Sequence, residues 1–352
     1  MRAAVIESFH GPLPVREVPD PVCPADGVVV SVRACGVCRS DWHAWTGGDP
    51  DVVAPHVPGH EFAGVVIEAG SACHVPVGTR VTAPFVLGCG VCEDCQRGEA
   101  TICDRQDTIG FTQWGAFAER LAIPRADFNV VALPHDLDDA AAAGLGCRVT
   151  TAFRALVDRA GLQPQEWVAV HGCGGVGLAA IQIAAALGAR PVAVDIREDK
   201  LQLARAFGAV AVVNAANEEQ AGKPVGDAVR ELTSGGAHVS IDALGITATF
   251  ENSLRSLRKL GRHVQIGMPL HEHASPVLPL LELVYSRQIS LYGTRGLPPQ
   301  RFSALFQWIA EGRLDVSALV TRRIALSEAG SVLDEMNHYE GLGICVIDRF
   351  DC

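Results

Sequence analysis

The sequence has no excess of basic residues. Lys and Arg number 29 against 40 Asp and Glu, so the formal net charge is −11 at pH 7. Proteins that bind nucleic acid need a basic surface to hold the phosphate backbone, and this composition therefore argues against a nucleic-acid partner. Hydrophobic residues make up 48% of the chain and charged residues 20%, which is typical of a globular protein rather than a disordered one.

The sequence also lacks a long uninterrupted apolar run. Its first residues, MRAAVIESFHGPLP, carry charge and proline where a secretory signal would need an apolar stretch. The most apolar region, residues 176–196, contains Gln182, Arg190 and Pro191, which argues against a membrane span. We therefore expect a soluble, cytoplasmic protein without a membrane partner.

Cysteines are too sparse for a small disulfide-stabilised scaffold, at 12 in 352 residues. Four of them fall between Cys89 and Cys103. In a chain without an export signal, clustered cysteines are more often metal ligands than disulfides. The cysteines that match no ligand pattern, interpreted as free thiols, are Cys23, Cys35, Cys73, Cys173, Cys345 and Cys352.

The length of 352 residues suggests about two domains. The first 135 or so residues contain short β-rich segments, such as GVVVSVR at 27–33, separated by Pro and Gly. From about Thr150, strand and helix patterns alternate, which predicts a parallel, doubly wound sheet. We expect strands at 167–172, 191–195, 210–214, 238–242, 261–266 and 289–293, and helices at 149–159, 177–187, 200–208 and 250–260.

The predicted fold class is therefore α/β with two domains. A doubly wound Rossmann domain would comprise residues 149–291. After it the chain returns to a helix-turn pattern, so the C-terminal segment is expected to rejoin the first domain. The β-rich domain would then consist of residues 1–148 and 292–352.

A glycine-rich turn, GCGGVG at 172–177, lies between an apolar strand pattern and a helix pattern. Glycines in this place permit a tight turn and close approach to a pyrophosphate, whose charge then lies at the helix N-terminus. Asp195 ends the next strand, where its carboxylate could accept hydrogen bonds from a ribose. A plain tight turn with a surface Asp is the alternative. The turn residues assigned to the cofactor are Gly172, Gly174, Gly175 and Gly177.

Asp195 also favours NAD over NADP, because a carboxylate repels a 2′-phosphate. Arg197, two residues later, is the one feature that could weaken this preference. A solvated loop arginine is its alternative interpretation.

Cys89, Cys92, Cys95 and Cys103 form the pattern C-x2-C-x2-C-x7-C. Closely spaced thiolates with intervening glycine can surround a tetrahedral ion, and a closed four-sulfur shell leaves no position for a substrate. The spacing therefore indicates a structural zinc. A redox disulfide pair or an iron–sulfur cluster remain alternatives.

A second set of candidate ligands is dispersed along the chain, with Cys38 in CGVCRSDWH, the pair His60 and Glu61 in PGHE, and Cys147 in GLGCRVTTAF. Each alone could be a buried thiol or a packed histidine. These segments, their order, the four-cysteine loop and the later GCGGVG with its Asp together resemble the zinc-dependent medium-chain alcohol dehydrogenases. The resemblance covers nearly the whole chain.

The resemblance implies a catalytic zinc bound by Cys38, His60 and Cys147, with Glu61 as the nearby carboxylate that can approach the metal. Three protein ligands leave the fourth position for water or substrate. It also implies a GroES-like β-rich catalytic domain beside the Rossmann domain, with the active site in the cleft between them.

Further roles follow from the same resemblance. Asp41 would orient the ring of His60, Ser40 would receive the substrate proton and His43 would be the outer base of the relay. A simple turn and an exposed histidine are the alternatives. Contacts to the cofactor would come from Arg39, Thr151, Val176, Lys200 and Arg295, and substrate-pocket walls from Phe85 and Trp45. His271 and His273 lie between prolines and are interpreted as a solvated loop.

The expected activity is the reversible oxidation of a primary or secondary alcohol to an aldehyde or ketone, with two zinc ions per chain and hydride transfer to NAD. A polyol or sugar dehydrogenase of the same superfamily is an alternative, against which the four-cysteine loop argues. A non-catalytic structural or binding descendant is another, but every zinc ligand is retained. The resemblance also implies a homo-oligomer, either a tetramer or a dimer.

Overall fold

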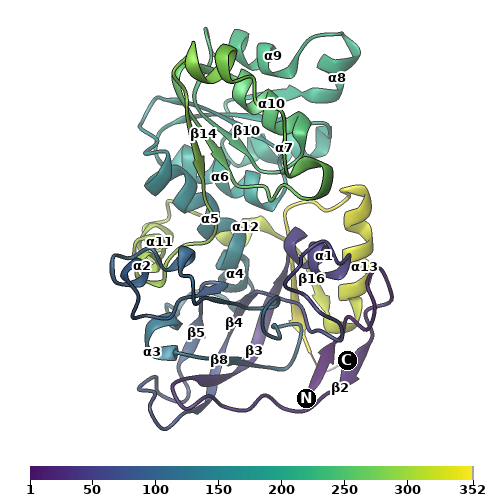
Figure 1. Ribbon diagram of the computed structural model, residues 1–352, viewed down its shortest axis with the longest axis vertical. Helices are drawn as coiled ribbons and strands as arrows, with labels where there is room; N and C mark the ends of the chain where they lie inside the picture. The colour runs from purple at the N-terminus through teal and green to yellow at the C-terminus, as the bar shows by residue number, and fades with distance from the viewer. Residues whose placement is uncertain (351–352) are drawn as a thin grey trace. The chain divides into compact units, whose positions relative to one another are not determined.

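The computed structural model describes residues 1–350, so Cys352 lies outside the described residues. The described chain forms two compact units (Figure 1). One consists of residues 1–150 and 296–350, and the other of residues 151–295. Within the described residues, no helix combines the length and the apolar character that crossing a bilayer would need.

The first unit is built on a seven-stranded, mostly antiparallel sheet. Its central strand, β3, pairs with β4 on one side, and with β8 and then β17 on the other. In order across the sheet, the strands are β16 (Val320–Ala325), β17 (Ile344–Arg349), β3 (Val28–Val37), β4 (Glu61–Ala69), β5 (Arg80–Thr82) and β9 (Val131–Ala132), with β8 (Arg120–Ile123) beside β3.

The core of this unit lies along β3 and β4, where Val30, Phe62 and Val66 are fully buried together with Phe117. Short strand pairs and helices complete the unit. They are β1 (Arg2–Ala4) with β2 (Val15–Glu17), β6 (Val86–Leu87) with β7 (Asp107–Thr108), and the helices α1 (Arg39–Trp45), α2 (Glu93–Gln96), α3 (Ala126–Asn129), α4 (Asp139–Gly144), α11 (Phe302–Ala310), α12 (Val316–Leu319) and α13 (Ala329–Glu335).

Helix α4 brings a chemically important segment against this sheet. The side chain of Asp138 caps its N-terminus by accepting the N–H of Ala141 at 3.2 Å. Its run of alanines, residues 140–143, is almost completely buried, and such small side chains let the helix backbone approach β3 and β4 closely. Directly after α4, residues Leu145–Val149 form a π-helical turn, a feature that is frequent at functional sites.

The second unit is a six-stranded parallel sheet with the strand order β12-β11-β10-β13-β14-β15. The order reverses between β10 and β13, as in the dinucleotide-binding doubly wound fold. The strands are β10 (Trp167–His171), β11 (Arg190–Asp195), β12 (Ala211–Asn214), β13 (Ala237–Asp242), β14 (Leu257–Gln265) and β15 (Ser290–Gly293). The helices are α5 (Thr150–Phe153), whose first residue still belongs to the first unit, α6 (Gly175–Ala186), α7 (Glu198–Ala206), α8 (Ala215–Gln220), α9 (Val225–Leu232) and α10 (Thr247–Arg255).

This architecture confirms the predicted α/β class with a β-rich and a doubly wound domain. The predicted helix at 250–260 is wrong at its C-terminal end, because α10 stops at Arg255. The hydroxyl of Ser256 donates to the carbonyl of Asn252 at 2.6 Å at the end of the helix, and Leu257 already pairs with Ala237 of β13. Pairing with a buried strand here outweighs the local helical pattern. Helices α8 and α9 were not predicted.

Candidate functional site

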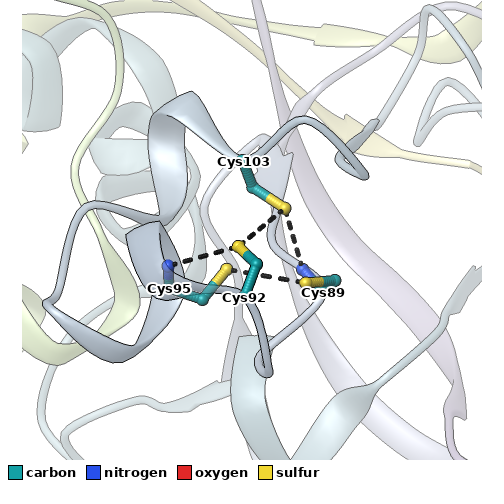
Figure 2. Close-up of side chains that lie close together, drawn as sticks. All are labelled: Cys89, Cys92, Cys95 and Cys103. Carbon is teal, nitrogen blue, oxygen red and sulfur yellow. Dashed lines mark hydrogen bonds between the residues drawn. The ribbon is translucent and has the colours of Figure 1, made fainter.

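The four-cysteine loop brings its sulfur atoms together within a short stretch of chain (Figure 2). Cys92 caps the N-terminus of α2, with its Sγ accepting the N–H of Cys95 at 3.5 Å. The Sγ atoms of Cys89 and Cys95 lie 4.0 Å apart, and those of Cys92 and Cys103 lie 3.7 Å apart. All four cysteines are free thiols.

These distances fit a tetrahedral zinc. A zinc–sulfur bond of about 2.3 Å gives a sulfur–sulfur separation of about 3.8 Å at the edges of a tetrahedron. The four Sγ atoms all lie within 4.8 Å of one another. The donor set of four thiols is also the one found in structural zinc sites.

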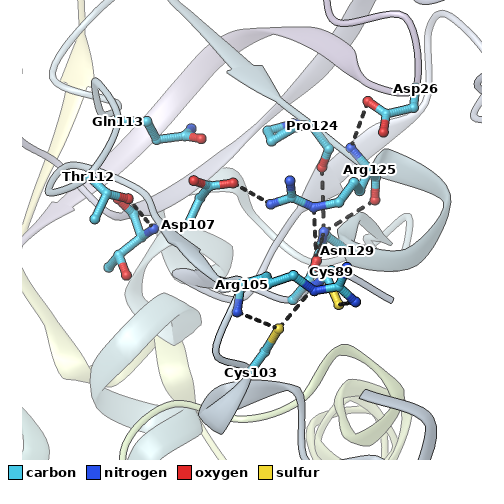
Figure 3. Close-up of polar contacts among 12 residues, drawn as sticks. Asp26, Cys89, Cys103, Arg105, Asp107, Thr112, Gln113, Pro124, Arg125 and Asn129 are labelled. Atoms are coloured by element: carbon cyan, nitrogen blue, oxygen red, sulfur yellow. Dashed lines mark hydrogen bonds and ion pairs between the residues drawn. The ribbon is translucent and has the colours of Figure 1, made fainter. Parts of the chain in front are cut away.

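Basic and N–H groups surround the sulfurs (Figure 3). The guanidinium of Arg105 lies 3.2 Å from Cys89 Sγ, and its backbone N–H donates to Cys103 Sγ at 3.3 Å. The backbone N–H groups of Val91 and Cys92 lower the pKa of Cys89 to about 6, against the effect of burial. These contacts favour the thiolate form of Cys89, the form that a metal requires, whereas burial raises the pKa of the Cys95 and Cys103 thiols.

The start of the loop is anchored from α3 and the residue before it. Arg125 Nε and Asn129 Nδ2 donate to the carbonyl of Gly88 at 3.0 and 3.1 Å. Arg125 also forms an ion pair with Asp107. The backbone directly before Cys89 is thus held in place by side chains from another part of the chain.

The second cluster is assembled by sheet topology. Cys38 directly follows β3 and His60 directly precedes β4. In the antiparallel pairing of these strands, Gly36 lies opposite Glu61, so both candidate ligands emerge at the same end of the sheet. The π-helical turn after α4 brings Cys147 to them. The ligand atoms of Cys38, His60, Glu61 and Cys147 lie within 4.8 Å of one another.

Asp41 organises two of these ligands from the first turn of α1. Its Oδ1 lies 2.8 Å from His60 Nδ1 and accepts the N–H of Gly59 at 3.0 Å, while its Oδ2 accepts the N–H of Cys38 at 2.8 Å. Both Asp41 and His60 are fully buried. With Nδ1 turned to the carboxylate, Nε2 is the ring atom that faces the cluster.

This second cluster also fits a metal. His60 Nε2 is buried and has no hydrogen-bond partner among the described residues, although buried polar atoms are normally satisfied. The ligand nitrogen of His60 lies within 4.8 Å of the thiols of Cys38 and Cys147. Two cysteines plus one histidine are a ligand set of catalytic zinc sites, which keep a fourth position open. The rings of Phe85 and Phe111 flank His60, with ring centroids at 5.6 and 5.4 Å.

In the second unit, the glycine-rich turn joins β10 to α6. Gly172 has a φ of +94°, which favours glycine, and a Cβ at Gly177 would lie 1.8 Å from the carbonyl oxygen of Gly172. At Gly174, by contrast, a Cβ would meet nothing within 4 Å. Open space above Gly174 at the N-terminus of α6 suits the approach of a pyrophosphate.

Asp195 ends β11 beside this turn. Its Oδ2 accepts the N–H of Cys173 at 2.8 Å and its Oδ1 accepts the N–H of Arg197 at 3.0 Å. Each carboxylate oxygen can accept a second hydrogen bond, so Asp195 can also bind hydroxyl groups. Lys200 on α7 is buried nearby, and burial lowers its pKa against the attraction of Asp195.

Comparisons with known proteins identify the family to which the chain belongs. A family model for the alcohol dehydrogenase GroES-like domain matches residues 24–135, and one for zinc-binding dehydrogenases matches residues 175–311. An alcohol dehydrogenase from Geobacillus stearothermophilus is 37% identical over 317 residues, which cover 89% of this chain and 90% of that protein. The chain belongs to the zinc-dependent medium-chain alcohol dehydrogenase family.

Solved structures show the same family fold. The crystal structure of an NAD-dependent alcohol dehydrogenase has a TM-score of 0.87 at 30% identity, covering 99% of this chain and 100% of its own. A zinc-binding dehydrogenase from Sinorhizobium meliloti 1021 bound to NADP has a TM-score of 0.85 at 28% identity, covering 99% and 98%. As an alcohol dehydrogenase family member, the chain is an oxidoreductase with a GroES-like and a zinc-binding dehydrogenase domain.

Helix α1 carries the predicted relay of this alcohol dehydrogenase family member. The hydroxyl of Ser40 lies 3.9 Å from Cys38 Sγ, and His43 is one helical turn further along. Arg39, predicted to contact the cofactor, is held within the first unit. Its guanidinium lies 3.7 Å from the ring centroid of Trp42 and 4.4 Å from that of Tyr339, and it donates to the carbonyl of Met336.

The remaining predicted residues lie in different settings. Trp45 is packed in the hydrophobic core, with its indole N–H donating to the carbonyl of Gly11 at 2.7 Å. Thr151 is buried on α5, Val176 lies in the first turn of α6, and Arg295 follows β15. His271 and His273 belong to neither metal cluster of the described residues.

Two residues of the site were missed in the sequence. Phe111 flanks His60 from a loop and leaves no motif that could have identified it. Arg148 is different, because it is a charged residue inside the apolar segment GLGCRVTTAF. A buried charge requires a partner, so this anomaly is the signal from which an ion pair could have been predicted.

Proposed function

We propose that this chain is a zinc- and NAD-dependent alcohol dehydrogenase that reversibly oxidises a primary or secondary alcohol to an aldehyde or ketone. The observation that carries the proposal is the convergence of Cys38, His60 and Cys147, with the buried His60 Nε2 lacking a hydrogen-bond partner in residues 1–350. These three residues would hold a catalytic zinc, and the four-cysteine loop would hold a second, structural zinc.

Zinc bound at the three ligands would polarise the substrate oxygen and lower the pKa of its hydroxyl group. Asp41 keeps the His60 ring in the orientation and tautomer that ligation needs. Ser40, beside Cys38, would accept the hydroxyl proton, and His43, one helical turn further along α1, would be the outer base of the relay. The apolar rings of Phe85 and Phe111 beside His60 would favour apolar substituents on the alcohol over the several hydroxyls of a polyol.

NAD would supply the hydride acceptor when bound. The glycine turn at 172–177 and Asp195 would hold its pyrophosphate and adenosine ribose, with Thr151, Val176, Lys200, Arg39 and Arg295 as further contacts. Support for NAD over NADP comes from Asp195 and from Arg197, whose guanidinium pairs with Asp199, with Nε 3.0 Å from Oδ1. An arginine neutralised in this way is less suited to bind a 2′-phosphate.

Initial rates over a panel of alcohols and carbonyl compounds, each with NAD and NADP, test the proposal. Metal analysis of the same preparation should give two zinc ions per chain. Turnover with NAD on simple alcohols is the expected result. A preference for polyols, or equal efficiency with NADP, would replace the corresponding part of the proposal.

A further inference from the structure

Arg148 contacts the sequence neighbours of two proposed catalytic ligands and is itself the neighbour of the third. It follows Cys147 directly in the sequence. Its Nη1 donates to the carbonyl of Val37, the residue before Cys38, at 3.1 Å. Its Nε and backbone N–H donate to Oε1 of Glu61, the residue after His60, at 3.0 and 3.2 Å.

The contact with Glu61 is a bidentate, buried ion pair. Nη2 of Arg148 pairs with Oε2 of Glu61 while Nε bonds the other carboxylate oxygen. The Arg148 side chain is 6% exposed and that of Glu61 is not exposed at all. A planar guanidinium matches a carboxylate in this geometry, which an ammonium group cannot reproduce.

Two glycines leave room for this pair. Gly36 lies opposite Glu61 in the sheet, and a Cβ there would lie 2.1 Å from Glu61 Oε2 and 2.7 Å from Arg148 Nη2. A Cβ at Gly146 would lie 2.7 Å from the Cα of Glu61. Side chains at either position would displace the ion pair, so the packing around it is specific.

We propose that Arg148 is a positioning residue that joins the end of β3, the start of β4 and the π-helical turn, and so preorganises the catalytic metal site. The inference rests on the proposed function, because it takes Cys38, His60 and Cys147 as the ligands. Without the arginine the three segments would lose their common hydrogen-bonded partner. The ligands would then leave the metal more readily, since groups that orient ligands typically change metal affinity about 10- to 100-fold.

The test compares Arg148→Met, Arg148→Lys and a control, Arg80→Met, in the full-length protein. Arg80 is also a multiply bonded arginine of the first unit, and it contacts the carbonyl of His135 and the carboxylate of Asp139 rather than the ligand segments. The rate at which a chelator removes the catalytic zinc is measured, together with the ligand-field absorption after replacement of that zinc by cobalt. Both quantities report on the metal site without requiring turnover.

We expect Arg148→Met to release the catalytic zinc about tenfold faster or more and to change the cobalt spectrum. Arg148→Lys should release the zinc at a rate between those of the wild type and Arg148→Met, and Arg80→Met should match the wild type in both measurements. If Arg148→Met does not fold, the double variant Glu61→Gln/Arg148→Met leaves no unpaired buried charge and should show the same rapid release.

Wild-type release rates and an unchanged cobalt spectrum in Arg148→Met, or in the double variant, would overturn the inference. The proposed function fails in a different way. A wild-type protein that binds one zinc per chain, or that binds two and oxidises no alcohol, would refute the function whatever the Arg148 variants do. A wild-type enzyme with two zinc ions and unaltered Arg148→Met would refute the inference alone.

Discussion

Replacing Asp41 by Asn tests how the buried carboxylate organises the metal site. The substitution preserves size but exchanges one acceptor oxygen for an NH2 donor. Among the described residues, Oδ1 accepts from two donors, Gly59 N–H and the His60 ring, whereas Oδ2 accepts only the N–H of Cys38. The asparagine will therefore place its oxygen on the side of His60, and its NH2 group will face the Cys38 N–H.

The expected loss of free energy follows from the two N–H donors, the asparagine NH2 group and the Cys38 N–H, that then face each other. A hydrogen bond to a charged group contributes about 1.5–3 kcal/mol, and a buried donor left without an acceptor costs about 1–3 kcal/mol. Because these two contributions overlap, we expect a loss of about 3 kcal/mol, which corresponds to about 100-fold in an equilibrium constant. The Cys38 backbone then shifts and the His60 ring loses its charged partner, so the loss should appear in the affinity for the catalytic zinc.

Competition with a chelator of known zinc affinity measures this effect directly. The matched control is Asp127→Asn, because Asp127 also bonds a histidine ring, that of His74, at 2.7 Å, and its backbone N–H at 2.8 Å. There the side chains are 43% and 90% exposed, so the change should alter zinc affinity less than about twofold. Wild-type zinc affinity in Asp41→Asn, or an equal loss in both variants, would refute the reasoning.

Four further predictions concern the zinc sites, the relay and the cofactor. Because a closed zinc site supports the fold, Cys92→Ser should lower thermal stability and remove one zinc per chain, with a smaller effect on turnover. A loss of turnover without any loss of thermal stability would contradict this prediction. Cys147→Ala should reduce turnover by several orders of magnitude while a fluorescence titration still shows NAD binding, and near wild-type turnover would exclude Cys147 as a ligand. Ser40→Ala should lower the rate of alcohol oxidation about 100-fold or more, and His43→Gln should lower it about tenfold at pH 7. The loss in His43→Gln should become smaller at higher pH or with added small-molecule base, and equal inactivity of the two variants would disprove the relay. Asp195→Ala should raise KM for NAD and relax the rejection of NADP in steady-state assays, whereas unchanged discrimination would mean that another residue contacts the ribose.

Much of the doubly wound domain could be predicted because its signals are local. Alternating strand and helix patterns and the glycine turn specify β10, α6 and β11 within a few residues. The errors occur where tertiary pairing dominates. Around Leu257 the chain retains a helical pattern, but Leu257 is fully buried and pairs with β13, and this pairing outweighs the local preference.

The four-cysteine loop was accessible from the sequence for a related reason. Its ligands all lie in one loop between Cys89 and Cys103, so no pairing of distant elements is needed to bring the sulfurs together. The sequence by itself therefore determined the two-domain α/β class, the glycine turn and the composition of this loop. In each case the decisive interactions lie between residues that are near neighbours in the chain.

Only the tertiary structure decided how the dispersed residues meet. Cys38, His60 and Cys147 come together because β3 pairs with β4 and because α4 packs closely on both strands. The same packing buries Arg148 and Glu61. Arg148 therefore forms hydrogen bonds that connect three ligand-bearing segments, although in the sequence it is only a single arginine in an apolar segment. Such contacts depend on register and on space between elements, and neither is encoded in any short stretch of sequence.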